Sequence, residues 1–173
     1  MNRLPRSILV AVLLAGATSL PGSAQQHVNM PAPAMGDILS KAPYRPGLGE
    51  LMTAFVQPRH TKLGLAGAAG SWDYAAYELD ELRETFDDVG KLILKHGDLS
   101  IPQAIASTVK QPLDALDSAI KARDQGAFTK AYADLTAGCN ACHASAGHPM
   151  IVIKVPDVSG AAFPDQDFGP IKK

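Results

Sequence analysis

Two cysteines and a histidine lie within five consecutive residues near the C-terminal end of the chain, as Cys139-Asn140-Ala141-Cys142-His143. In this C-x-x-C-H spacing each thiol can add across a vinyl group of a porphyrin, and the imidazole can coordinate its iron. On a helix, Cys139, Cys142 and His143 fall at i, i+3 and i+4, so all three side chains project from one face. The pentapeptide therefore predicts one covalently attached haem c, with His143 as the proximal iron ligand.

The same spacing also occurs in redox-active dithiols, in zinc sites and in structural disulfides. A zinc site needs two further ligands at matched spacing, but the chain has only these two cysteines and no second close pair of His or Cys. A redox dithiol usually begins a helix, whereas this pair comes near the end of a helical pattern. Haem attachment is therefore the favoured interpretation.

The first 24 residues predict an export signal. Arg3 and Arg6 form a basic start, residues 7–20 form an apolar run, and Gly22-Ser23-Ala24 is a small-residue cleavage site. We expect a signal peptide over residues 1–24, cleavage after Ala24 and a periplasmic mature protein. The apolar run is short for a bilayer span, so we expect no integral membrane segment in the mature chain.

The size and charge of the mature chain restrict its partners. Its length of about 149 residues is enough for one compact domain with a core of its own. The whole chain has 16 Lys and Arg against 17 Asp and Glu, and cleavage removes two of the basic residues. A mildly acidic surface argues against binding to nucleic acid or to an anionic membrane.

Amphipathic periodicity after an arm rich in Pro, Met and Ala predicts four helices. The arm covers residues 25–46 and has no sustained period, so we expect a flexible segment. Pro58 lacks a backbone donor and predicts a kink near residues 54–58, and Pro112 predicts a kink or break in the third helix. The expected helices cover about 47–68, 72–95, 101–126 and 127–145.

Helices of similar length joined by short loops predict an all-α fold, an antiparallel up-down-up-down four-helix bundle over residues 47–146. Ser100, with Gln103 three residues later, predicts a capping box at the start of the third helix. No strand is predicted before Met150. The proline-rich end predicts an extended C-terminal tail over residues 147–173, which we expect to pack back over the bundle.

An export signal, four helices and a single C-x-x-C-H near the end of the last helix resemble the class II c-type cytochromes. This family is the cytochrome c′ group together with its low-spin, methionine-ligated members. The resemblance covers roughly residues 47–146 and rests on architecture and on the position of the motif. It implies a distal iron ligand taken from the first helix, and it also implies a possible homodimer, because members often pair through their first two helices.

The sixth iron ligand has two candidates in the first helix. In an antiparallel bundle the end of the last helix, with His143, lies beside the start of the first. At about 1.5 Å per residue, Met52 is roughly 8 Å from that start and His60 roughly 20 Å. Met52 is therefore the favoured distal ligand and His60 its rival, and the resemblance also points to Met52. An iron left without a sixth ligand is the third possibility.

Two functions follow from these alternatives. With His143 and Met52 as axial ligands, the protein is expected to be a single-electron carrier between periplasmic redox proteins and not an enzyme. With a five-coordinate iron, it is expected to bind a diatomic gas such as NO or CO in an apolar pocket that Leu48, Leu51 and Phe55 can line. A peroxidase is the weakest alternative, since spacing places no distal Arg and His pair other than Arg59 and His60.

An acidic run lies along the second predicted helix. We expect it to form an exposed helix face, with a docking patch for a basic redox partner as the alternative. The run consists of Glu78, Asp80, Glu81, Glu84, Asp87 and Asp88.

Overall fold

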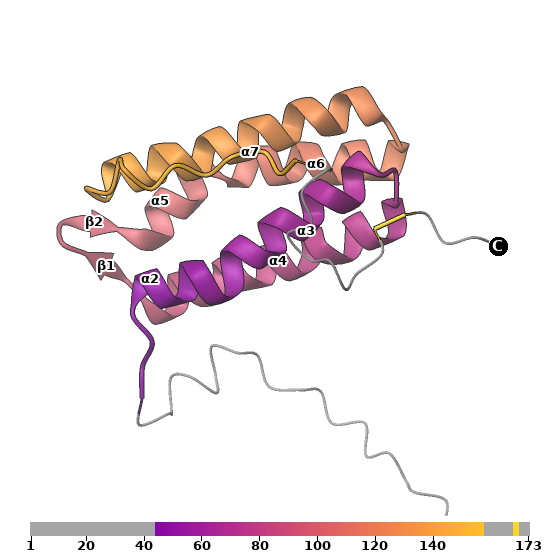
Figure 1. Ribbon diagram of the computed structural model, residues 1–173. Helices are drawn as coiled ribbons and strands as arrows, with labels where there is room; N and C mark the ends of the chain where they lie inside the picture. Colours follow the sequence, from indigo (N-terminus) through magenta and orange to yellow (C-terminus); the bar gives the residue numbers. More distant parts are fainter. Residues whose placement is uncertain (1–43, 158–167, 170–173) are drawn as a thin grey trace, which may run out of the picture. The chain divides into compact units, whose positions relative to one another are not determined.

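The computed structural model describes residues 44–157 and 168–169 (Figure 1). The predicted signal peptide, most of the predicted arm and the rest of the tail lie outside the described residues. The described part of the chain is mostly helical, which confirms the all-α class. Within it, no helix is both long and apolar enough to cross a bilayer. The elements are α2 (Leu48–Leu51), η1 (Met52–Val56), α3 (Gln57–Ala68), α4 (Trp72–Leu92), β1 (Lys95–His96), β2 (Leu99–Ser100), α5 (Ile101–Thr108), α6 (Lys110–Ala122) and α7 (Gln125–Ser145).

The first helical segment runs through α2, η1 and α3 and contains a π-helical turn. In η1 the N–H of Gln57 donates to the carbonyl of Met52, five residues earlier. Pro58 follows directly, and it has no N–H to donate to the carbonyl of Ala54. An irregular turn just before the proline accommodates this lost hydrogen bond, so the kink predicted near residues 54–58 corresponds to η1.

A small antiparallel sheet follows α4, although no strand was predicted before Met150. The helix ends at Leu92 and not near residue 95, and the chain turns through Gly97, which has a positive φ of 59°. His96 pairs with Leu99 across this turn. The prediction was wrong because two-residue strands are too short to produce a recognisable alternation.

The start of α5 also differs from the prediction. Ser100 is the N-cap residue, but its side chain makes no capping hydrogen bond, so the predicted capping box is absent. The backbone of Ser100 instead pairs with Lys95 in the sheet. The entry to α5 is therefore set by the hairpin and by Pro102 in the first turn.

The third predicted helix is divided into α5 and α6 at Val109, three residues before Pro112. Pro112 has no backbone N–H to donate to the carbonyl of Thr108. The helix therefore breaks about one turn before the proline. At its other end α6 stops at Ala122, because Arg123 adopts a left-handed conformation with φ 53°. The predicted end near residue 126 was thus too late.

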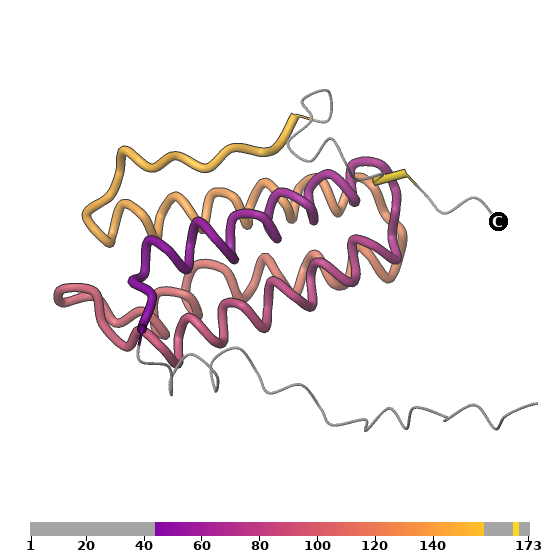
Figure 2. Tube along the Cα trace, turned by 60° about the horizontal axis from the view of Figure 1, so that its bottom comes forward, coloured from indigo at the N-terminus to yellow at the C-terminus, as the bar shows by residue number. Residues whose placement is uncertain are grey.

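The helices pack along one another around a leucine-rich core. α3 lies along α4 and α6 along α7, while α7 also contacts α3 and α5 (Figure 1). The start of the first helical segment lies at the same end of the molecule as the end of α7 (Figure 2). Six of the fully buried side chains are Leu51, Leu63, Leu79, Leu82, Leu116 and Leu135.

The predicted exposed acidic face on α4 is wrong for two of its members. Glu78 is only 1% exposed and Asp88 is also buried. A guanidinium nitrogen of Arg59 on α3 lies 3.2 Å from Glu78, and the other lies 2.7 Å from Glu81. Glu78 is buried because it faces the neighbouring helix, and its charge is compensated there by Arg59.

Candidate cofactor site

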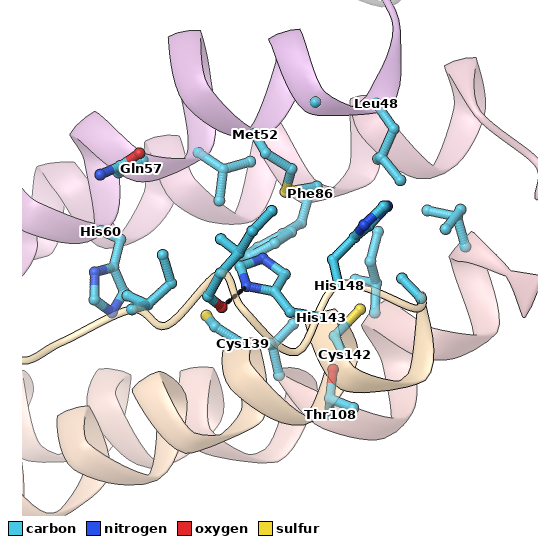
Figure 3. A pocket seen from close by; sticks show the side chains of 18 of the residues that line it. Leu48, Met52, Gln57, His60, Phe86, Thr108, Cys139, Cys142, His143 and His148 are labelled. Atoms are coloured by element: carbon cyan, nitrogen blue, oxygen red, sulfur yellow. Dashed lines mark hydrogen bonds between the residues drawn. The ribbon is translucent and has the colours of Figure 1, made fainter. Parts of the chain in front are cut away.

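A pocket of about 340 Å³ lies between the first helical segment, α4, α5 and α7 (Figure 3). The side chains of Cys139, Cys142 and His143 line it, and so does that of Met52 from the facing helix. The remaining wall is mainly apolar. Its apolar members include Leu48, Val56, Phe86, Ile101, Ile105, Val109, Ile151 and Ile153.

Cys139, Cys142 and His143 lie on one continuous helix, α7, which ends two residues later at Ser145. The thiol of Cys139 is buried, that of Cys142 is half-buried, and both are free. Burial raises the pKa of Cys139 to about 12 and also raises the pKa of Cys142. Redox-active dithiols need a lowered thiol pKa, so this environment argues against the dithiol alternative.

The orientation of His143 leaves one ring nitrogen available to a metal. Its Nδ1 lies 2.9 Å from the carbonyl oxygen of Ile151 (Figure 3). A carbonyl only accepts hydrogen bonds, so Nδ1 must carry the proton and Nε2 keeps its lone pair. Histidines that bind metals through Nε2 commonly have such a partner on Nδ1, which holds the ring in place.

The chain after α7 forms one side of the pocket. Residues 151–157, which we call the return segment, have no regular secondary structure and run back beside α7 (Figure 2). The amide nitrogen of Asn140 donates to the carbonyl of Ile153 at 2.9 Å, and the N–H of Ile153 donates to the amide oxygen at 2.7 Å. Asn140 and His143 thus each hold one residue of the return segment.

Met52 lies in the π-helical turn, on the wall that faces α7. Its thioether points into the pocket, toward the side from which His143 projects (Figure 3). Within the same turn of chain, Leu51 is fully buried in the core, whereas Met52 and Thr53 line the pocket. A thioether sulfur is an established axial ligand of haem iron. The predicted distal ligand is therefore on the correct wall to serve.

His60 also borders the pocket, but both of its ring nitrogens have partners in the protein. Nε2 lies 3.1 Å from the hydroxyl of Thr136, which itself donates to the carbonyl of Tyr132 and so accepts from His60. Nδ1 lies 3.0 Å from the hydroxyl of Tyr132. Burial lowers the pKa of His60 to about 4, so the ring is neutral. Binding a metal would break this network, which disfavours the rival ligand.

The donors and the polarity of the pocket fit a haem c. Two thiols and an imidazole with a free Nε2 come from one helix face, and a thioether comes from the opposite wall. An apolar lining suits a porphyrin, whose faces are apolar. Of the residues predicted to line an apolar gas pocket, Leu48 lines it, whereas Leu51 is in the core and Phe55 is partly exposed.

Sequence reasoning did not connect His96, His148 or Asn140 to this site. His96 is exposed, and it lies at the pocket together with His148. Asn140 occupies a variable position of the pentapeptide, and its role depends on the path of the return segment. The tail was expected to pack back over the bundle, but the sequence does not indicate that Ile153 meets Asn140.

No protein-family model, no curated protein and no solved structure matches this chain. The interpretation of the pocket therefore depends on its own residues and geometry.

Proposed function

We propose that this chain is an exported mono-haem c-type cytochrome that carries single electrons between periplasmic redox proteins. One observation carries the proposal. Cys139, Cys142 and His143 project together into an apolar pocket whose opposite wall presents Met52. This is the donor set that a covalently attached, six-coordinate haem requires.

The four residues have separate roles in this proposal. Cys139 and Cys142 form the two thioether bonds, His143 binds iron through Nε2, and Met52 binds it through sulfur. A haem held in this way supplies a one-electron iron couple. The carbonyl of Ile151 would keep the His143 ring oriented.

Electron transfer is favoured over catalysis because His143 and Met52 would together hold the iron of a bound haem. With both ligands in place, substrates would be excluded from the metal, and ligands on packed helices would move little when the charge of the centre changes. The mainly apolar lining suits such a buried centre. No described residue is assigned an acid or base role here.

We further propose that the helices form the antiparallel four-helix bundle of the class II c-type cytochromes, with the methionine-ligated members as the nearest branch. Three features support this: the lateral packing of α3 on α4 and α6 on α7, the contact of α7 with α3, and the motif at the end of the last helix. The export signal over residues 1–24 supports a periplasmic location, where haem c is attached.

Absorption spectra of the purified exported protein test the proposal. Oxidised and reduced spectra are recorded with and without CO for the unmodified protein, for Met52→Ala and for Met150→Ala. Met150 is the matched control, because its side chain is 74% exposed and lies outside the pocket lining. We expect a low-spin protein with the weak long-wavelength band of a methionine sulfur bound to ferric iron.

Met52→Ala is expected to lose that band, become high-spin and bind CO, whereas Met150→Ala is expected to behave as the unmodified protein. A chain whose mass shows no covalent haem would contradict the proposal entirely. The Cys139→Ala/Cys142→Ala variant provides the reference mass of the chain without haem.

A high-spin spectrum of the unmodified protein that shifts readily with CO would favour the second candidate, a five-coordinate binder of NO or CO. The observation in its favour is that the neighbours of Met52 in the pocket lining include the apolar side chains Leu48, Val56 and Phe86. Such a wall provides the uncharged surroundings that a diatomic gas needs when no protein group binds the sixth position.

A further inference from the structure

Two exposed histidines meet at the edge of the pocket. His96 belongs to β1, and His148 follows the end of α7, 52 residues later in the chain. Their Nε2 atoms are 3.2 Å apart, and their ring centroids are separated by 5.3 Å with an interplanar angle of 50°. The proposed function uses neither residue, so the pair is free for another role.

The backbone on both sides of this pair is held by hydrogen bonds. His96 pairs with Leu99 across the turn at Gly97. The N–H of His148 donates to the carbonyl of His143 at 2.8 Å, and its own carbonyl accepts from Ile151 at 3.0 Å. The two imidazoles are thus brought together by segments that are each fixed locally, which lowers the entropy lost when a ligand joins them.

We propose that His96 and His148 together bind a divalent transition-metal cation of the Zn²⁺ type at the rim of the pocket. Imidazole nitrogens bind Zn²⁺ at about 2.0 to 2.1 Å. Two nitrogens 3.2 Å apart then subtend an angle of about 100° to 106° at the metal, close to the tetrahedral value. Each ring would bind through Nε2 and keep its proton on Nδ1.

The rest of the coordination shell is supplied by solvent. Among residues 44–157 and 168–169, no group of three His, Cys, Asp or Glu is arranged to hold a metal. A site with two protein ligands is open and exchangeable, in contrast to a closed structural zinc site with four. Cu²⁺ is expected to bind the same nitrogens more tightly than Zn²⁺, following the general order for divalent ions.

The metal would connect the hairpin between α4 and α5 to the turn after α7. Both segments contribute a histidine to the lining of the same pocket. A cation bound by both is a cross-link present only in the folded protein, so its binding stabilises the native state by mass action.

Calorimetric titration with Zn²⁺ tests the proposal, because this ion is redox-inert and does not exchange electrons with the proposed haem. We expect one Zn²⁺ per chain, and we expect both His96→Ala and His148→Ala to weaken binding by at least about tenfold. Zn²⁺ should raise the Tm of the unmodified protein but not that of either variant. The matched control is His27→Ala, which is expected to retain the affinity.

The proposal does not rest on the proposed function, and the two can fail separately. Free thiols are counted first, because unreacted Cys139 and Cys142 would themselves attract Zn²⁺. If they are free, the haem assignment fails and the titration is made with Cys139→Ala/Cys142→Ala as the starting protein. Binding that is absent, or that persists unchanged in the His96→Ala/His148→Ala double variant, would overturn the metal site.

Discussion

The side-chain amide of Asn140 pairs with both backbone groups of Ile153, with donor to acceptor distances of 2.9 and 2.7 Å. This pairing joins the variable part of the C-x-x-C-H pentapeptide to the return segment. Two residues earlier in that segment, the carbonyl of Ile151 accepts from His143. The pentapeptide therefore holds the return segment through Asn140. The return segment in turn orients His143, the proposed proximal ligand.

Asn140→Ala removes both hydrogen bonds to Ile153. We expect a loss of about 1 to 3 kcal/mol in the free energy of unfolding, since each hydrogen bond contributes roughly 0.5 to 1.5 kcal/mol. Denaturant titration measures this change in the free energy of unfolding. Because the return segment also carries the acceptor for His143, a change in reduction potential is expected as well. A return segment held by apolar packing alone would leave both quantities unchanged. Lys130→Ala, on the exposed side of the same helix, is the control.

Close contact between α5 and α7 makes Gly138 sensitive to substitution. A Cβ atom added there would overlap the carbonyl oxygen of Thr108, which is backbone and cannot rotate away. We expect Gly138→Ala to destabilise the protein by about 1 to 3 kcal/mol. Gly126→Ala on the same helix is the control: its nearest neighbour would be 3.5 Å away, so thermal unfolding should show little loss or a slight gain.

The ion pair between Arg59 and Glu78 is expected to matter more than the exposed ion pairs. Arg59→Ala leaves the carboxylate of Glu78 buried without its guanidinium, which costs about 3 kcal/mol of unfolding free energy. Lys121→Ala breaks the contact with Asp117, where both side chains are exposed, and should cost less than about 1 kcal/mol. Equal losses in urea denaturation would show that burial does not distinguish the two pairs.

The pentapeptide and the helical periodicity were enough to predict the all-α class and to bring Cys139, Cys142, His143 and Met52 to one pocket. They worked because the C-x-x-C-H spacing and the 3.6-residue period are local properties of the chain. Glu78 was expected to be exposed, because nothing near it in sequence indicates that Arg59 lies opposite. The break in the third helix was predicted from Pro112, but it falls at Val109, because the proline leaves a carbonyl one turn earlier without its donor.

Contacts between distant segments account for what the sequence could not predict at the site. The hydrogen bonds of Asn140 and the meeting of His96 with His148 depend on where the chain goes after α7. The favoured distal ligand, Met52, lines the pocket, and so does its rival His60. Its two partners on α7, Tyr132 and Thr136, could only be identified once the helices were packed.

Burial of neutral His60 makes the stability of the protein dependent on pH. Its pKa is lowered from 6.5 to about 4 by burial, so the unfolded chain binds a proton between these values and the folded chain does not. The stability is therefore fully present above about pH 6.5 and falls as the pH falls toward 4, by roughly 3 kcal/mol in total. Denaturation curves between pH 7.5 and about 4 measure this loss. His60→Gln, which cannot titrate, should flatten this part of the profile. A profile that stays equally steep in His60→Gln would assign the proton uptake to another group.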